Sequence, residues 1–220
     1  MKINSYKSFC SHLYVSRETY EKFEIYCETL LKWQKSINLI SNSTIGNIWV
    51  RHFLDSAQLY DFTKNISGNI LDLGSGAGFP GLILAMMGNK NICVIESDKK
   101  KCTFIREVAM LSDTNIKIYN TRIEDLSFFK PNLITSRALA PLNKLIKYVE
   151  NYMAKSPSNS EKFPKLLFLK GKYYKDELLE LCKTRNIDYK AYQSITDEFG
   201  KIVYINKVNV LNITNEKKNE

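Results

Sequence analysis

The residues best suited to chemistry lie in the glycine-rich stretch 69–81, NILDLGSGAGFPG. Its first five residues, of which Ile70, Leu71 and Leu73 are apolar, predict a short buried strand that stops abruptly at Gly74. Gly76 and Gly78 follow at alternate positions, and Pro80 suits the first turn of the apolar helix that comes next. A strand, a glycine turn and a helix N-terminus together are typical of a binding site for a nucleotide-type cofactor.

The spacing of the glycines distinguishes between cofactors. A dinucleotide-binding turn has the pattern G-x-G-x-x-G, but Phe79 occupies the third glycine position here. No Gly-Lys-Ser/Thr follows, which excludes a Walker phosphate loop. A G-x-G-x-G turn with an acid, Asp72, two residues upstream resembles motif I of class I S-adenosyl-L-methionine-dependent methyltransferases. Glycines let a ligand lie against the backbone, although this stretch alone also allows a tight turn without a ligand.

Residues at the ends of three later strands are suited to the same cofactor. Glu96 ends the predicted second strand, where a carboxylate accepts hydrogen bonds from both ribose hydroxyls. Ile123 and Glu124 follow the third strand, where an apolar side chain can cover the adenine. Arg137 ends the fourth strand and is a candidate for positioning the cofactor carboxylate, a phosphate or the target base. Ligands of such sheets bind beyond the carboxyl ends of the strands, so one crevice is expected to hold these residues together with Gly74 and Lys170.

The rest of the chain predicts the elements that position these residues. From residue 69 on, predicted strands and helices alternate, which indicates an α/β fold with a mostly parallel, doubly wound sheet. Two last strands, near 188–195 and 201–208, predict a terminal antiparallel hairpin. The division expected is an N-terminal helical cap (1–66), a methyltransferase domain that binds S-adenosyl-L-methionine (67–210) and a polar tail (211–220).

The helical cap is expected to contain two helices. Ser16 is a suitable N-cap for a helix that continues to about residue 35, with one apolar stripe. A second helix is expected from about residue 45 to residue 60. Residues 1–15 carry little pattern, and we expect a mobile or loosely docked start.

The composition of the chain limits the classes of protein to which it can belong. The chain has 220 residues, of which 44% are hydrophobic and 12% aromatic, which is ample for a core. No apolar run is long enough to cross a bilayer, and the N-terminus lacks the features of a signal peptide. Five cysteines without a C-x-x-C pair favour free thiols in a reducing cytoplasm over disulfides or zinc. We therefore expect a cytoplasmic protein, a monomer, with no metal and no membrane partner.

A formal net charge of +9 favours a polyanionic partner. The candidate RNA-binding residues near the mouth of the crevice are Lys99, Lys100, Lys101, Arg122 and Lys170. The ordinary alternative for the run of three lysines is a solvated helix face. His52 is one of only two histidines and has no cluster of metal-ligating residues around it, which favours a structural or RNA-facing role over that of a catalytic base.

Seven motifs in order resemble one family, the bacterial 16S ribosomal RNA guanine-N7 methyltransferases, also called glucose-inhibited division protein B. They are INLIS (37–41), RHFLDS (51–56), LDLGSGAGFPG (71–81), IESDKKK (95–101), TRIEDL (121–126), SRALAPL (136–142) and LKG (169–171). The resemblance covers about residues 30–208 and implies S-adenosyl-L-methionine as cofactor and 16S ribosomal RNA or the small ribosomal subunit as partner. It also implies cofactor contacts at Gly74, Phe79, Ile123, Glu124 and Arg137.

The implied chemistry agrees with the residues present. Guanine N7 is a neutral acceptor with an exposed lone pair, so it needs no deprotonation before it attacks a sulfonium methyl group. No convincing general base is found, and no residue is assigned with certainty as catalytic. The absence of an Asn/Asp-Pro-Pro-Tyr/Phe sequence after the fourth strand argues against methylation of an exocyclic amine. Two alternatives remain: a methyltransferase for another RNA, a small molecule or a protein, and a non-catalytic cofactor-sensing or RNA-binding module.

Overall fold

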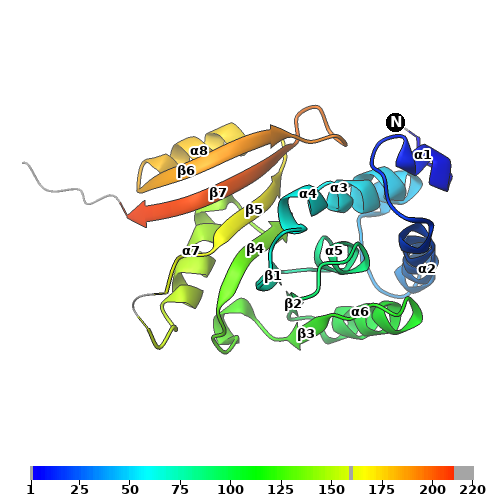
Figure 1. Cartoon of the computed structure of the whole chain (residues 1–220), viewed down its shortest axis with the longest axis horizontal. Coiled ribbons are helices and arrows are strands. Elements are labelled where there is room, and N and C mark those ends of the chain that lie inside the picture. The colour runs from blue at the N-terminus through cyan, green and yellow to red at the C-terminus, as the bar shows by residue number, and fades with distance from the viewer. Residues whose placement is uncertain (1, 159–160, 211–220) are drawn as a thin grey trace, which may run out of the picture.

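A seven-stranded sheet organises the computed structural model, which describes residues 2–158 and 161–210 (Figure 1). The strand order is β3-β2-β1-β4-β5-β7-β6, with β1 to β5 parallel and β7 antiparallel to both of its neighbours. The strands are β1 (Asn69–Leu73), β2 (Ile92–Glu96), β3 (Lys117–Asn120), β4 (Pro131–Arg137), β5 (Lys165–Lys170), β6 (Arg185–Gln193) and β7 (Lys201–Val210). The predicted mostly parallel sheet with a terminal antiparallel hairpin is confirmed, while the predicted polar tail lies outside the described residues.

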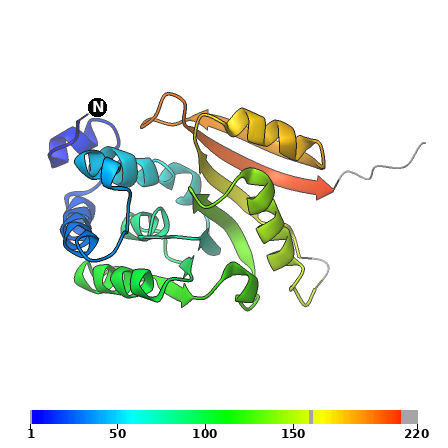
Figure 2. The same cartoon turned by 180° about the vertical axis from the view of Figure 1, so that it is seen from behind.

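Each face of the sheet buries its own core, because successive strand residues point to opposite sides. Ile70 and Val94 face one core, whereas Leu71 and Ile95 face the other. Helices α2 (Arg17–Gln34), α5 (Gly81–Met86) and α6 (Lys99–Leu111) cover the first face; α7 (Leu142–Met153) and α8 (Tyr174–Cys182) cover the second (Figures 1 and 2). Coverage on both sides explains why the central strands are almost continuously apolar. None of the helices described is long and apolar enough to cross a membrane.

Residues 2–15 are packed into the core, with Ile3, Phe9 and Val15 buried, whereas a mobile or loosely docked start was expected. Helix α1 (Tyr6–Cys10) is capped by Ser5, whose side chain accepts a hydrogen bond from the Ser8 amide. Phe9 is fully buried, and its ring lies 5.8 Å from that of Tyr20 and 6.3 Å from that of Trp49. Such a short helix is stabilised by the apolar surface that it buries rather than by its own hydrogen bonds.

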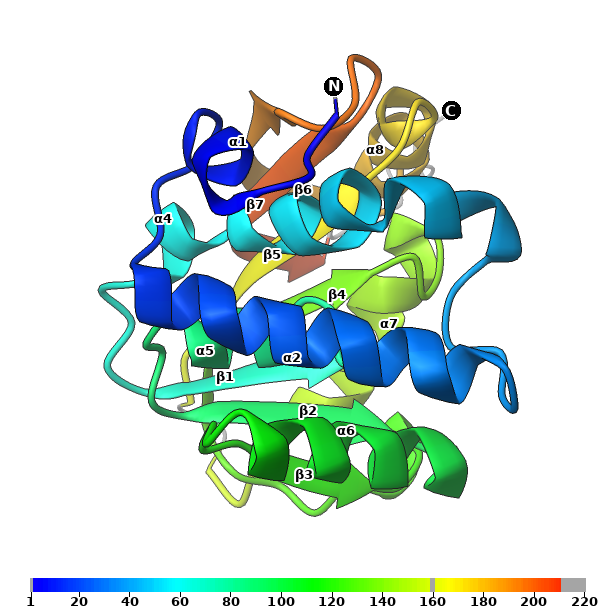
Figure 3. The ribbon, with the colours of Figure 1, turned by 90° about the vertical axis from the view of Figure 1, so that its right-hand side faces the viewer.

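The segment before β1 is helical but broken, unlike the single helix expected over residues 45–60. It contains a 3₁₀ helix η1 (Asn42–Asn47), a π-helical turn η2 (Trp49–Leu54), α3 (Asp55–Ala57) and α4 (Tyr60–Thr63). Figure 3 shows this segment above α2, on the side of the sheet that carries α5. Its buried side chains belong to the same core as the sheet residues of that face. The division of the chain at residues 66 and 67 stays a prediction.

Candidate active site

A cleft of about 760 Å³ lies at the carboxyl ends of β1, β2, β4 and β5. It is lined by all the residues expected around one crevice, namely Gly74, Glu96, Ile123, Glu124, Arg137 and Lys170. Four further candidates also line it: Gly76, Phe79, Lys101 and Arg122. Gly78, Lys99 and Lys100 do not line it. The topology therefore brings side chains from four separate loops to one place, as the rule for doubly wound sheets requires.

The glycine turn presents open backbone to this cleft at Gly76. Gly76 has a φ of +60°, a left-handed conformation that side chains disfavour. A Cβ added there would meet no atom within 4 Å, although the residue lines the cleft. Gly78 differs, because a Cβ there would lie 3.0 Å from the Tyr26 hydroxyl. Gly76 is thus the glycine that leaves room for a ligand, whereas Gly78 makes room for a helix.

Asp72 fixes the glycine turn through hydrogen bonds to its buried carboxyl group. Its Oδ2 accepts hydrogen bonds from the Ser75 hydroxyl at 2.6 Å and from the Gly81 amide at 2.9 Å. The side chain is fully buried, and its Oδ1 has no hydrogen-bond partner among the described residues. Burial raises the pKa of Asp72 to about 7, and its hydrogen bonds only partly oppose this effect. The acid upstream of the glycines therefore connects β1 to the start of α5.

This raised pKa predicts a pH-dependent stability that Asp72→Asn removes. The folded protein disfavours ionisation of Asp72, so its contribution is fully present below pH 4 and is lost as the pH rises through 7. The loss amounts to at most about 4 kcal/mol. Denaturant unfolding at several pH values gives the free energy of unfolding of the wild type and of Asp72→Asn. The loss is the change with pH in the difference between these two free energies. Asp61→Asn, at an exposed aspartate, should keep the wild-type dependence; equal pH slopes for wild type and Asp72→Asn would contradict the expectation.

Glu96 lies beside Gly76 at the end of β2. Its Oε2 accepts a hydrogen bond from the Gly76 amide at 2.9 Å, and its Oε1 accepts one from the Asp98 amide at 2.8 Å. These bonds fix a buried carboxylate, yet each oxygen keeps a further acceptor site. A pair of neighbouring hydroxyls fits this arrangement, with the open backbone of Gly76 next to it. The chain thus has the features that a ribose-containing cofactor needs.

Ile123 and Glu124 lie on the short 3₁₀ helix η3 (Ile123–Asp125) after β3 and line the same cleft as Glu96. Lys155, at the end of α7, donates hydrogen bonds to the carbonyl oxygens of Glu124 and, at 2.9 Å, Leu126. Lys155 thereby connects η3 to the end of α7, which packs against the same core.

Arg137 is held by residues from the broken helical segment. Its Nη1 donates to the Arg51 carbonyl at 2.8 Å and lies 3.5 Å from Asp55 Oδ2. Its Nη2 lies 2.8 Å from His52 Nδ1, and its guanidinium lies 5.0 Å from the centre of the Phe79 ring. Among the described residues no acceptor contacts its Nε–H. One edge of this cation is therefore fixed, while the Nε–H remains available to an anion.

His52 is neutral and fully engaged. Burial, together with the positive charge of Arg137, lowers the pKa of His52 to about 3. Because Arg137 donates to Nδ1, the ring proton lies on Nε2 and is donated to the Thr44 hydroxyl at 2.8 Å. This histidine orients Arg137 and has no free nitrogen for proton transfer. The sequence pattern favoured a structural or RNA-facing role over that of a catalytic base, but it gave no sign of Arg137 as the partner.

The model of the family described as rRNA small subunit methyltransferase G (GidB) matches residues 19–202. The chain belongs to this family. Over 194 residues it is 41% identical to the ribosomal RNA small subunit methyltransferase G of Paramagnetospirillum magneticum, covering 88% of this chain and 91% of that protein. It is equally identical to that of Rickettsia prowazekii, with 88% and 97% covered. The family expected from the seven motifs is confirmed.

Solved structures show the same fold at low identity. A magnesium protoporphyrin IX methyltransferase from Synechocystis, solved with bound SAM, has a TM-score of 0.57, with 12% identity, 89% of this chain and 99% of that chain covered. A ribosomal protein L11 methylase from Lactobacillus delbrueckii has a TM-score of 0.51, with 16% identity and 69% and 76% covered. These likenesses confirm the predicted class I methyltransferase fold.

The candidate RNA-binding residues of this family member fall into two groups. Lys99, Lys100 and Lys101 form the first turn of α6, which Asp98 caps, and no ion pair involves them within the described chain. Arg122 is exposed at the rim of the cleft.

Lys170 differs from the other candidates. Its Nζ lies 2.6 Å from Glu177 and donates to the Ala140 carbonyl at 3.0 Å, and its side chain is 9% exposed. This cation holds α8 to the loop after β4, which leaves it poorly placed for a phosphate.

Other residues of the cleft were not singled out from the sequence. Arg51, Asp55 and the β6–β7 loop line it, yet they come from segments far from the glycine turn. The motif RHFLDS contained the only signal for the first two. No group of three His, Cys, Asp or Glu side chains suited to a metal ion occurs in the part of the chain that the structure describes.

Proposed function

We propose that this protein transfers a methyl group from S-adenosyl-L-methionine to N7 of a guanine in 16S ribosomal RNA. The observation that carries the proposal is the cleft in which Gly76, Glu96 and Arg137, each part of a family motif, lie together. Relatives that are 41% identical are named ribosomal RNA small subunit methyltransferase G, which supports this substrate class.

Three parts of the cleft would hold the cofactor. Glu96 would accept hydrogen bonds from the ribose hydroxyls above the open backbone of Gly76. Ile123 would cover the adenine, with Glu124 beside it. Arg137 would bind the carboxylate through its Nε–H, because its other edge is already engaged. The glycine turn, including Gly78 and Phe79, would support these contacts from behind. When bound, the cofactor supplies the electrophilic methyl group.

The residues of the chain would act by positioning. Guanine N7 carries its own lone pair, so the protein has to orient the base and exclude water rather than remove a proton. The engaged, neutral His52 agrees with a reaction that needs no general base. The positive charge that develops on the purine would face the carboxylates at the cleft, among them Asp197 and Glu177.

We propose that the RNA approaches over the first turn of α6. Lys101 and Arg122 line the cleft beside Ile123, and Lys99 and Lys100 precede Lys101 in the same helical turn. No ion pair within the described residues involves any of these four cations. The net charge of +9 supports a polyanionic partner. We further propose that the protein acts as a monomer in the cytoplasm.

A transfer assay tests the function. Labelled methyl from S-adenosyl-L-methionine is offered to naked 16S RNA, assembled small subunits, free guanosine and a protein mixture. Label in the RNA or the subunit supports the proposal. Label in guanosine or protein alone favours the alternative methyltransferase, and cofactor binding without any transfer favours a non-catalytic module.

The basic group predicts a salt dependence. If these lysines neutralise phosphates, a plot of log affinity for RNA against log salt concentration should be linear and steep. Each of Lys99→Ala, Lys100→Ala and Lys101→Ala should reduce the slope by about 0.7–0.9 if that lysine contacts a phosphate. Fluorescence titration with a 16S RNA fragment measures the affinity at each salt concentration. Lys183→Ala, at an exposed lysine on the other face, is the control, and a slope unchanged in the triple variant would remove this surface from the RNA site.

A further inference from the structure

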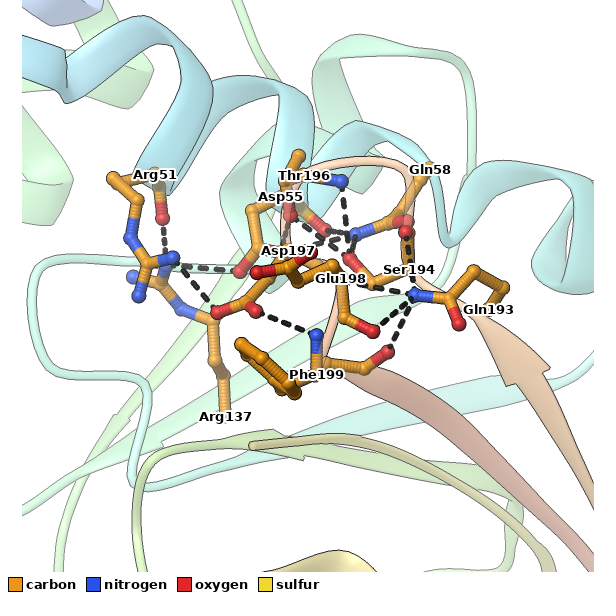
Figure 4. Close-up of polar contacts among 11 residues, drawn as sticks. Arg51, Asp55, Gln58, Arg137, Gln193, Ser194, Thr196, Asp197, Glu198 and Phe199 are labelled. Carbon is orange, nitrogen blue, oxygen red and sulfur yellow. Dashed lines mark hydrogen bonds and ion pairs between the residues drawn. The ribbon is translucent and has the colours of Figure 1, made fainter. Parts of the chain in front are cut away.

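The β6–β7 loop, residues 194–200, is attached to the helical segment that holds Arg137 (Figure 4). Gln58 makes two of the contacts: its Nε2 donates to Ser194 Oγ at 3.1 Å, and its Oε1 accepts from the Ile195 amide at 3.0 Å. The Thr196 hydroxyl donates to Asp55 Oδ1 at 2.6 Å. An ion pair of 3.0 Å joins Arg51 to Asp197. Ser194, Asp197 and Gly200 line the cleft, so the loop forms one of its walls.

Asp55 connects this loop to Arg137. Its Oδ1 accepts the hydrogen bonds of Thr196 and of Gln58, and its Oδ2 lies 3.5 Å from Arg137 Nη1. The side chains of Asp55 and Arg137 are only 19% and 16% exposed. Such shielding makes this pair more sensitive to its surroundings than a surface ion pair.

Arg51 provides a second connection. Its carbonyl accepts a hydrogen bond from Arg137 Nη1, while its side chain pairs with Asp197 of the loop. The same helical turn therefore holds the loop on one side and the guanidinium on the other. A displacement of the loop would remove its contacts with Asp55 and Arg51. Because both residues contact the Arg137 guanidinium, the orientation of its edge toward the cleft would then change as well.

We propose that Thr196 and Asp55 are positioning residues, which couple the β6–β7 loop to the binding of the cofactor by Arg137. The inference rests on the proposed function, in which Arg137 binds the cofactor carboxylate. A docked loop keeps the guanidinium ready for this anion, and by linkage a bound cofactor strengthens the docking of the loop. The loop forms a wall of the cleft, so the RNA meets a site that the cofactor has already ordered.

Thr196→Val is the first test, because it removes the donor and keeps the shape of the side chain. We expect the affinity for S-adenosylhomocysteine, measured by calorimetry without RNA, to fall about 5- to 10-fold. Thr196→Ser retains the hydroxyl and should restore it. Phe199→Ala alters the same loop at a side chain that is 60% exposed, and it should leave the affinity unchanged.

Hydrogen exchange supplies a readout that a merely structural contact would not change. In the wild type, S-adenosylhomocysteine should slow exchange of the loop amides, including that of Ile195. In Thr196→Val this protection should be lost, even where a high ligand concentration saturates the protein. If Thr196→Val does not fold, Asp55→Asn replaces it, with the same loss of affinity and protection expected.

The outcomes separate this inference from the proposed function. Wild-type affinity and wild-type loop protection in folded Thr196→Val would overturn the coupling, even if the wild type methylates RNA normally. A lower unfolding temperature with unchanged affinity would likewise reduce Thr196 to a structural contact. A wild type that fails to bind S-adenosylhomocysteine would instead overturn the proposed function.

Discussion

Gly76→Val is expected to abolish binding of S-adenosyl-L-methionine while the protein still folds. The added branched side chain would occupy the open part of the cleft beside Glu96, where the ligand has to lie against the backbone. Because no atom of the protein lies within 4 Å of the new Cβ, the substitution fills ligand space rather than disturbing the core. We expect the affinity to fall at least about 100-fold, beyond a loss of about 2.7 kcal/mol.

The comparison variant separates this effect from backbone strain. Gly76 has a left-handed φ, which costs a non-glycine residue about 1–2 kcal/mol in stability wherever it occurs. Gly88→Val places the same residue at another positive φ, +111°, outside the cleft. Both variants should lose stability in denaturant unfolding, but only Gly76→Val should lose binding in calorimetry. Wild-type affinity in folded Gly76→Val would place the cofactor elsewhere.

The sequence predicted the central sheet and the cofactor half of the cleft because both depend on local signals. Alternating strands and helices define the parallel order, and the capping residue Ser16 is found where the pattern placed it. Gly76 and Glu96 lie at the ends of adjacent strands, so the topology alone brings them together. A periodic pattern and a turn motif are sufficient for such features.

The other half of the cleft depends on contacts that no local pattern encodes. The partners of Arg137 come from residues 51–55, and the loop that contacts Asp55 lies about 140 residues further along the chain. The π-helical turn that carries His52 has the same apolar spacing as a regular helix, which explains the wrong prediction of one helix there. Phe9 was overlooked because its helix is too short to show a period. Tertiary packing decides these features.

Replacement of the target guanosine by 7-deazaguanosine is expected to eliminate methyl transfer. Carbon takes the place of the N7 lone pair, so the nucleophile is absent while the rest of the base and the RNA are nearly unchanged. The rate should fall below detection in a labelled-methyl assay with a reconstituted small subunit or an RNA fragment. Binding should largely survive, because the phosphate contacts proposed for residues such as Lys100 would provide most of the affinity and do not depend on N7.

His52→Ala is the control that separates loss of the nucleophile from loss of a base. With guanosine at the target, this variant should show weaker cofactor binding through Arg137, yet it should keep the pH profile of the wild type, because the pKa of His52 lies near 3, far below the working range. With 7-deazaguanosine, the wild type and the variant should be equally inactive. Continued methylation of the 7-deaza RNA at that nucleotide would place the methyl group on another atom. The N7 assignment would then be wrong, while the fold and the family, which rest on the sheet order and the match over residues 19–202, would be unaffected.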